Sequence, residues 1–396
     1  MNSYHNVKQL VDFGMQPISN RYLRDPRDEE QLFPLKLGQC PQTGLIQLID
    51  PIPQEELVPK YDWVTYFEPE DHLDELVARF HKKFVKKPNF KAAGISFKDV
   101  STLKRFEQLG YKTWRVDAIK DLDLDKGCGV ESVQCVLNVH KSKKIAKQYQ
   151  RADFVVVRHI WEHVYNQQEF AGALKEMVTD GGYIYFEVPD STSLINAKDY
   201  TMPWEEHLYC YTPLTFRDSL QKQGFTIVDL ETIPYRYENI IYAVVKVGMP
   251  ENYEKISDEK IYDEIKKGEI YKEGFQEAKK DISDILIKES QTKTIMIFGA
   301  GHNSIAFVNH YSLQDFIDCV VDDHPKKQGM YMPKSKIPIK NSEALYHCKS
   351  TLCLIAVNPV HEDKIISKNK KFLQGGGVFS SIYPSSEYSI FGTSDL

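Results

Sequence analysis

The strongest constraint on the fold is a set of short apolar runs that recur between helical patterns. In the middle of the chain, FVVV (154–157) and YIYFEV (183–188) are apolar and aromatic enough to be buried strands. Between them, NQQEFAGALKEMVTDGG has the pattern of a helix that is closed by Gly181. Strands that alternate with helices in this way predict a parallel α/β sheet.

A second block of the same kind begins near residue 293. The segments TIMIFGAGHNS (294–304), DCVVDD (318–323) and LCLIAVNP (352–359) each hold an apolar run, and helix-length segments separate them. This spacing predicts a second parallel α/β sheet.

The remaining parts of the chain have their own patterns. Residues 1–75 are rich in proline and turn signals. The highly charged stretch 251–292 predicts an amphipathic helical connector, because its apolar residues lie near helical spacing. These residues are Ile261, Ile265, Phe275, Ile282 and Leu286. We therefore expect four units, at residues 1–75, 76–250, 251–292 and 293–396.

Composition excludes several classes of protein. A net charge of −6 over 396 residues gives no electrostatic reason to expect nucleic acid or an anionic membrane as a partner. The sequence has no run of 18 apolar residues and begins without a signal-peptide pattern. Its seven scattered cysteines lack any CxxC spacing, as expected of free thiols in the cytoplasm. We expect a cytoplasmic protein of enzyme size with two or three domains.

The segment YTMPWEEHLYCYTP (200–213) combines acid–base groups with aromatic rings. It places Glu205, Glu206 and His207 between Trp204 and Tyr209. One interpretation is a helix start flanked by core aromatics, and the other is the wall of a reaction pocket. A simple helix cap needs neither the histidine nor the flanking rings, so the composition favours the pocket.

A second polar group follows the predicted strand at 154–157. Arg158, His159, Glu162 and His163 lie where that strand ends, and ligands of open α/β sheets bind at the carboxyl ends of strands. His159 and His163 are four residues apart, which places them on one face of a helical turn. Histidines in such positions are more often structural hydrogen-bonding groups than catalysts. No third ligand is evident, so we predict no metal.

The stretch KAAGISFKDVSTLKRFEQLGYKTWRVD has the order of a nucleotide-like cofactor site. A turn at Gly94 precedes a helix, and the next predicted strand ends in Asp117. Such an acid accepts hydrogen bonds from a ribose diol, while the loop lets a ligand approach the backbone. The alternative is a surface turn with a helix cap from Asp99 or Ser101.

The glycine turn FGAGHNS (298–304) in the last unit has alternatives of its own. A turn after a strand, with VVDD (320–323) at the next strand end, is one way to hold NAD. The same geometry also supports packing or the binding of a substrate nucleotide. A third glycine and a hydride-transfer constellation are both missing from the sequence.

The whole chain resembles the sugar C-methyltransferases, which use S-adenosylmethionine to methylate a carbon of a nucleotide-linked keto-sugar. The resemblance rests on VDFGMQPISNRYL and FPLKLGQCPQTGLIQL in the N-terminal part. It continues in RHIWEHVYNQQEF, GGYIYFEVPD and WEEHLYCYTPLTF, and ends in IFGAGHNSIAF and VDDHPKKQGMYMPKSKIPI. It implies an α/β protein with a small N-terminal substrate domain and a central class I methyltransferase domain of Rossmann-like fold. A C-terminal Rossmann-like domain completes the sugar-nucleotide site.

The resemblance also implies roles for individual residues. His207 falls on the general base of the family, Glu206 on its acidic neighbour, and Trp204 where a tyrosine is common. The implied catalytic set is His207, Glu206, His163, Tyr61 and Tyr66. The implied cofactor set is Gly94, Ser96, Lys98, Asp99, Asp117, Arg158 and His159. The implied substrate set is Trp204, Glu205, Tyr209, Asn239, Gly299, Gly301, His302 and Lys327.

The chain departs from the family pattern in two places. The family carries four zinc-binding cysteines in its N-terminal domain, whereas this sequence keeps only Cys40, with Thr43 at the partner position and His5 near the missing first pair. We therefore predict no zinc. The loop AAGISFKD has lost most of the family's glycines. Because S-adenosylmethionine has no phosphates to cradle, loss of glycine need not abolish its binding.

The predicted function is methyl transfer from S-adenosylmethionine to a carbon next to the ketone of a nucleotide-linked keto-sugar, within polysaccharide or deoxysugar biosynthesis. A base within reach makes such a carbon acidic enough to react. The alternatives are a sugar-nucleotide-binding protein with a decayed cofactor site, an NAD-linked sugar-nucleotide enzyme, and methylation of an oxygen. The expected partner is the nucleotide-sugar substrate, with neither nucleic acid nor membrane, and the expected state is a monomer or homodimer.

Overall fold

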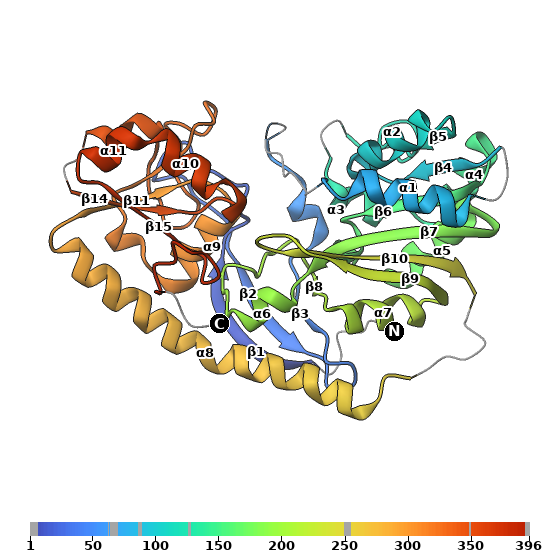
Figure 1. Cartoon of the computed structure of the whole chain (residues 1–396), viewed down its shortest axis with the longest axis horizontal. Helices are drawn as coiled ribbons and strands as arrows, with labels where there is room; N and C mark the ends of the chain where they lie inside the picture. Colours follow the sequence, from blue (N-terminus) through green and yellow to red (C-terminus); the bar gives the residue numbers. More distant parts are fainter. Residues whose placement is uncertain are drawn as a thin grey trace.

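The computed structural model describes residues 7–61, 63, 70–85, 89–125, 128–248, 255–347 and 350–392. These residues form three β-sheets, and one long helix runs beneath the sheets at the two ends of the chain (Figure 1). None of the described helices is both long and apolar enough to cross a membrane.

The central sheet has six strands in the order β5-β4-β6-β7-β10-β9. The parallel strands are β5 (Lys112–Arg115), β4 (Lys91–Gly94), β6 (Ala152–Arg158) and β7 (Val178–Asp190). The antiparallel pair at one edge is β10 (Asn239–Val247) and β9 (Phe225–Ile233). This order confirms the predicted class I fold. Its topological switch point lies between β4 and β6, because the chain leaves β4 toward β5 and later returns to pair β6 on the other side.

Helices cover both faces of this sheet because β6 is buried at every residue and needs apolar partners on each side. One face packs against α1 (Leu73–Phe84) and α2 (Val100–Gln108). The other packs against α3 (Val130–Val136), α4 (Val139–Tyr149), α5 (Gln167–Met177) and α7 (Pro213–Lys222).

The predicted end of the helix before β7 was wrong by several residues. Helix α5 ends at Met177, and β7 starts at the next residue. Gly181 has a φ of 75° and lies within β7, where the pairing register with β6 shifts. Its left-handed backbone thus supports a bulge in a strand rather than a helix end.

The N-terminal sheet contains a strand from a distant part of the sequence. Its order is β1-β2-β3-β8, all antiparallel, with β1 at Lys8–Gln16, β2 at Phe33–Gln39, β3 at Ile46–Ile49 and β8 at Tyr209–Cys210. The short strand β8 follows helix α6 (Thr192–Asn196), which itself follows the central strand β7. The N-terminal sheet is therefore closed by a segment of the central part of the chain.

The C-terminal sheet is fully parallel, in the order β13-β12-β11-β14-β15. Its strands are β11 (Thr294–Phe298), β12 (Cys319–Val321), β13 (Ile339–Lys340), β14 (Thr351–Ile355) and β15 (Val378–Ser381). Its helices are α9 (His302–Tyr311), α10 (Glu362–Lys368) and α11 (Lys370–Gln374). The second predicted parallel sheet is present.

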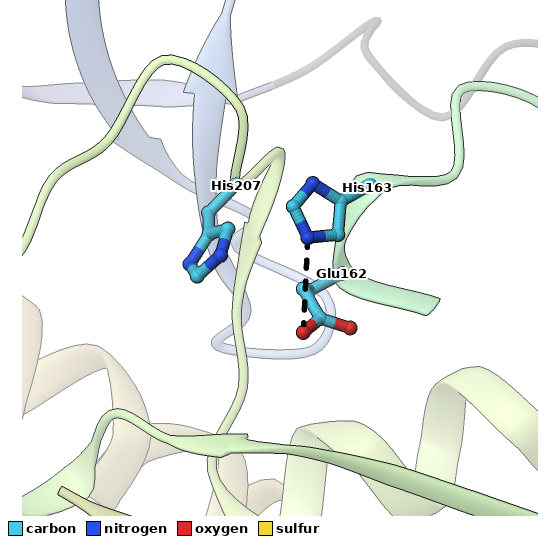
Figure 2. A group of neighbouring side chains, drawn as sticks. All are labelled: Glu162, His163 and His207. Carbon is cyan, nitrogen blue, oxygen red and sulfur yellow. Dashed lines mark ion pairs between the residues drawn. The ribbon is translucent and has the colours of Figure 1, made fainter. Parts of the chain in front are cut away.

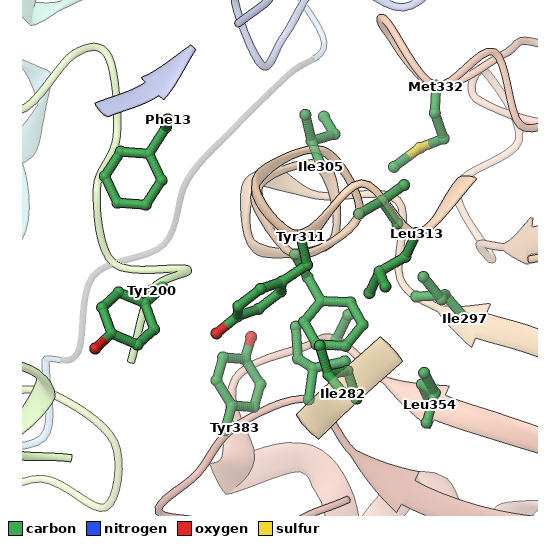
Figure 3. Packing of buried hydrophobic residues seen from close by; sticks show 14 of the residues in the cluster. Phe13, Tyr200, Ile282, Ile297, Ile305, Tyr311, Leu313, Met332, Leu354 and Tyr383 are labelled. Atoms are coloured by element: carbon green, nitrogen blue, oxygen red, sulfur yellow. The ribbon is translucent and has the colours of Figure 1, made fainter. Parts of the chain in front are cut away.

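Helix α8 (Asp258–Ser290) joins the central and C-terminal sheets and runs under β1 (Figure 1). One continuous hydrophobic cluster contains residues of the N-terminal sheet, α8 and the C-terminal sheet. Figure 3 shows Phe13 of β1 and Ile282 of α8 in this cluster with Ile297 of β11. The two ends of the chain therefore share one core, while the central sheet keeps its own.

Candidate active site

Residues 204–208 carry His207 and are held between the N-terminal and central sheets. The Leu208 amide donates to the Glu162 carbonyl at 2.9 Å, and the Leu208 carbonyl accepts from the Leu48 amide at 2.9 Å. Strand β8 follows and pairs with β3. The His207 amide also donates to the Trp204 carbonyl at 3.0 Å, which closes a turn. Two sheets therefore fix the backbone on which His207 stands.

The two carboxylates before His207 are buried and contact the N-terminal segment. Glu205 accepts hydrogen bonds from the Ser19 amide and hydroxyl, and Glu206 accepts one from the Asn20 side-chain amide at 3.3 Å. Burial raises the pKa of Glu205 to about 7, although the Ser19 bonds oppose it. Burial, followed by the nearby carboxylates, raises the pKa of Glu206 well above its usual value. Burial therefore favours the protonated form of both carboxyl groups, and Lys98 and Arg21 partly oppose this for Glu206.

His207 is half-buried among aromatic rings. Its ring lies 4.7 Å from the ring of His163 at 87° and 4.7 Å from that of Trp204. Burial lowers the pKa of His207 well below 6.5, and His163 and His302 lower it further. The imidazole is therefore neutral at physiological pH, and a neutral imidazole has a lone pair that can accept a proton.

His163 lies between two groups of carboxylates. Its Nδ1 is 3.1 Å from Glu131 of α3, and its Nε2 is 3.9 Å from Glu162, as the dashed line in Figure 2 marks. Burial lowers the pKa of His163, but Glu131 and then Glu162 outweigh burial, so the net shift is upward. Sequence reasoning missed Glu131, because nothing in residues 128–135 marks it as different from any other helix-start acid.

A cavity of about 1100 Å³ opens beside these groups. The predicted residues that line it are Tyr61, Lys98, Arg158, His163, Trp204, Glu206 and His207. The loop after β14 adds Asn358, Val360 and His361, so all three sheets contribute to its wall. Known ligand pockets are usually about 300–1,000 Å³, so this cavity is at the upper end of their size range. Tyr66 lies outside the described residues.

The predicted cofactor loop is closed by its own carboxylate. Asp99 accepts hydrogen bonds from the amides of Ile95 at 2.7 Å, Ser96 at 2.8 Å and Arg158 at 2.9 Å. A Cβ on Gly94 would come within 2.8 Å of the Asp99 Cβ, so this glycine makes room for Asp99. Lys98 and Arg158 line the cavity, whereas Gly94, Ser96 and Asp99 are not part of its lining.

A buried charge network lies at the switch point under this loop, and sequence reasoning missed its centre. Glu187 of β7 faces Arg158 Nε at 2.9 Å, His159 Nε2 at 3.0 Å and His72 Nε2 at 3.1 Å. Burial raises the pKa of Glu187, but Arg158 and the two histidines hold it well below its usual value. The sequence did contain a signal for this network. Glu187 is the single charged residue in the apolar run 183–188, and a charge buried in a strand needs a partner of opposite charge.

His72 connects this network to the cavity. Its Nδ1 lies 2.7 Å from the hydroxyl of Tyr235, which lines the cavity. Asn239 accepts a hydrogen bond from the Tyr235 amide at 3.1 Å and so fixes this turn. His159 has a φ of 49° and is buried behind the wall.

The predicted residues of the C-terminal unit lie behind Trp204. His302, the first residue of α9, places its ring 4.9 Å from that of Trp204 and its Nδ1 3.1 Å from the Ser19 hydroxyl. Lys327 donates to the Ala300 carbonyl at 2.6 Å within the Gly299–Gly301 turn. Tyr209 lines a separate cavity of about 810 Å³.

The main cavity fits S-adenosylmethionine in size and in charge. Glu70 and Asp71 on its wall suit the ammonium and sulfonium groups, and Lys98 suits the carboxylate. Asp117, in contrast, is half-buried and outside the lining, and its Oδ1 accepts the amides of Ile119 and Lys120 at 3.0 Å. The wall residues fit the cofactor better than the predicted acid does.

Comparisons with known families agree with this architecture. Residues 101–230 match a model described as "Methyltransferase domain", and residues 243–384 match "C-methyltransferase C-terminal domain". Residues 3–57 match "Putative zinc binding domain", although this segment holds a single cysteine, Cys40. The first match begins after the Gly94–Asp99 loop. Among curated proteins, no relative matches the chain.

Solved structures similar to this chain include methyltransferases with low identity. The 1,6-didemethyltoxoflavin N1-methyltransferase of Burkholderia thailandensis is 14% identical, with a TM-score of 0.30 over 45% of this chain and 79% of that one. An S-adenosylmethionine-dependent methyltransferase from Aquifex aeolicus is 13% identical, with a TM-score of 0.29 over 46% and 100%. The glycopeptide N-methyltransferase MtfA, complexed with S-adenosylmethionine, is 11% identical, with a TM-score of 0.28 over 48% and 100%.

The strand order of the central sheet, the fit of the main cavity and the consecutive family matches lead to one assignment. The chain is an S-adenosylmethionine-dependent methyltransferase with a C-methyltransferase C-terminal domain.

Proposed function

We propose that this methyltransferase acts on a carbon next to the ketone of a nucleotide-linked keto-sugar, with His207 as the general base. The observation that supports the proposal most directly is the position of His207. It is neutral at physiological pH, it lines the large cavity, and a turn and two sheets fix its backbone. A group of this kind can take a proton from a weakly acidic carbon.

The neighbours of His207 suit the other requirements of the reaction. S-adenosylmethionine, when bound, supplies the electrophilic methyl group. His163, whose ring meets that of His207, can stabilise the enolate oxygen that forms when the proton leaves. Tyr61 lines the same cavity and donates its hydroxyl to the Tyr22 carbonyl at 2.9 Å, so it would have to exchange that bond to serve the substrate.

Residues at the other end of the cavity would hold the cofactor. Glu70, Asp71 and Lys98 are the charged groups that we assign to it. The loop after β14 brings Asn358 and His361 to the cavity from the C-terminal sheet, and we assign these two residues to the nucleotide. This arrangement leaves the reacting carbon between the cofactor and His207, and orientation then supplies much of the rate enhancement.

The test is His207→Asn, measured both as methyl transfer and as exchange of the acidic C–H in D₂O. Loss of a general base typically costs about a hundredfold to ten-thousandfold. Both readouts should fall together, while ligand binding and the melting temperature stay close to wild type. His140→Asn is the control, because it removes an exposed histidine of α4 that lies outside the cavity lining.

Near-wild-type turnover of His207→Asn on the true substrate would rule out His207 as the base. Loss of methyl transfer with unchanged C–H exchange would place His207 in a later step than deprotonation.

A further inference from the structure

Three buried groups converge on one point of the cavity wall. Glu131 comes from the start of α3, His163 from the turn after β6, and Glu206 from the segment before β8. One ligand-type atom of each lies within 4.8 Å of the other two. Each residue is at most 5% exposed, and all three line the cavity.

The cluster contains a buried nitrogen that lacks a well-formed hydrogen bond. Nδ1 of His163 lies 3.1 Å from Glu131, at ion-pair distance, but no described residue forms a hydrogen bond with it. Nearly all buried polar groups in proteins have a hydrogen-bonding partner. The cluster can therefore take a further partner on this side of the ring.

The charge of the cluster points to a cation as that partner. One oxygen of Glu131 and one of Glu206 lie within 4.8 Å of each other and of a His163 nitrogen, and Glu205 is next to Glu206 in sequence. Lys98 lines the same cavity and lowers the pKa of Glu206, so it offsets part of this charge. A divalent ion can offset the remainder, because bound cations often dominate the local electrostatics of a site.

We propose that Glu131, His163 and Glu206 bind one divalent cation of the Mn²⁺ or Zn²⁺ class, with its open coordination positions facing the cavity. Two carboxylates and one imidazole are ligands that both metals accept. Three protein ligands leave room for a substrate oxygen, as catalytic metal sites require. If the proposed function holds, the cation polarises the ketone while His207 removes the neighbouring proton.

We place the cation on the Nδ1 side of His163 because of the groups on its Nε2 side, which Figure 2 draws. On the Nε2 side, Glu162 and His207 also lie within 4.8 Å of the ring nitrogen. A cation bound on the Nε2 side would coordinate the lone pair of His207, which could then no longer accept a proton as the proposed base. Glu162 is also absent from the cavity lining, whereas Glu131 and Glu206 are both part of it.

The test is titration of metal-stripped, full-length protein with Mn²⁺, followed by the electron paramagnetic resonance signal of the free ion. We expect one saturable site per chain, and competition by Zn²⁺. Glu131→Gln and Glu206→Gln should each weaken binding by at least tenfold. Asp71→Asn removes a carboxylate from the same cavity outside the cluster, so its Mn²⁺ affinity should stay near that of wild type. Melting temperatures verify that each variant is folded.

Two results would overturn the inference. One is the absence of saturable binding of Mn²⁺ and Zn²⁺ at about millimolar concentration. The other is binding that both glutamine variants leave unchanged. If the metal-stripped enzyme transfers methyl as fast as the loaded one, the cation has no catalytic role and the methyltransferase proposal stands. If the site binds Mn²⁺ as described but C–H exchange and methyl transfer are absent, the site stands and the proposed substrate class fails.

Discussion

The central and C-terminal sheets each place a glycine turn after their first strand, and a carboxylate binds the backbone of each turn. In the central sheet the carboxylate is Asp99, which belongs to the turn itself and is fully buried. In the C-terminal sheet it is Asp322, at the end of the next strand, which accepts the Ala300 amide at 2.8 Å and pairs with Lys327 at 3.2 Å. In both turns a carboxylate accepts hydrogen bonds from backbone amides, but the carboxylate comes from a different position relative to the turn.

The surroundings of the two turns differ more than the turns do. Under the central turn lies the buried pair of Arg158 and Glu187, and the large cavity opens in front of it. Beside the C-terminal turn, the ring of His302 packs against Trp204. The comparison teaches that two similar glycine turns acquire different surroundings, a cavity in one case and a packed ring in the other, according to what neighbouring segments place beside them.

The largest effect on stability should come from the buried charge at the central switch point. Glu187→Gln removes the buried carboxylate that pairs with Arg158 Nε, although Glu70 still pairs with the guanidinium at 3.3 Å, and breaking a buried pair typically costs about 3–5 kcal/mol. Urea unfolding measures this loss. Glu231→Gln is the control, because it breaks an exposed pair with Arg79 in the same sheet and should cost less than about 1 kcal/mol. Equal costs for the two variants would show that the buried network is not the feature that separates the two turns.

Asp99 should make the central turn sensitive to pH. Burial raises the pKa of Asp99 to about 6 from 3.8, against the three amides that lower it. The folded state therefore holds a proton that the unfolded state loses first. The free energy of unfolding should fall by about 3 kcal/mol as the pH rises from 3.8 to 6, at about 1.4 kcal/mol for each pKa unit.

Asp99→Asn should remove this pH-dependent part of the free energy of unfolding. Unfolding experiments on wild type and variant at a series of pH values measure it as the difference between the two free energies. Asp117→Asn serves as the comparison, since hydrogen bonds from nearby backbone amides lower the pKa of Asp117. Its contribution to stability is lost as the pH falls, so its difference curve should have the opposite slope. Parallel curves for the two variants would contradict the account of Asp99.

The contribution of Asp117 to cofactor binding is a smaller effect. If the cofactor reaches the end of β5, Asp117→Ala should weaken S-adenosylmethionine binding by about 1.5–3 kcal/mol, measured by calorimetry. Asp117→Asn keeps an oxygen that can accept the amides of Ile119 and Lys120, and so separates loss of charge from loss of the turn. Unchanged affinity in both variants would place the cofactor wholly on the cavity wall near Lys98.

The smallest expected effect concerns the N-terminal sheet. Without the paired cysteines of the family, Cys40→Ser should leave the zinc content and the melting temperature unchanged. Elemental analysis is best done in the Glu206→Gln background, so that the cluster in the cavity does not contribute metal. One zinc per chain that Cys40→Ser removes would show that the N-terminal segment still binds the ion.

Much of the fold could be predicted because its signals are local. The run FVVV is apolar throughout, and it forms a strand that is buried on both sides. The apolar spacing around Phe275, Ile282 and Leu286 matches the buried residues of α8. Apolar periodicity predicts such elements because burial is the main driving force of folding.

The site was only partly predictable. The sequence brought His207 and Glu206 to attention, since acid–base groups among aromatic rings are unusual in a surface segment. Nothing in the sequence indicated that His163 would pair with Glu131, which lies 32 positions earlier. The sequence also gave no indication of a third metal ligand. Residues so far apart in the sequence come into contact only when helices and strands pack together, and a local sequence pattern does not predict such a contact.

The sequence by itself determined two α/β units with parallel strands, an amphipathic connector and a segment of acid–base groups around His207; the antiparallel pair β10–β9 of the central sheet was not predicted. Only the tertiary structure decided that two residues, Tyr209 and Cys210, complete the N-terminal sheet and thereby carry His207 to the end of β6. A strand of two residues is too short to show an alternation of apolar and polar residues, so its sequence does not predict it. Its position follows from hydrogen bonds to β3, a strand more than 150 residues earlier, which form only once the separate parts have folded against each other.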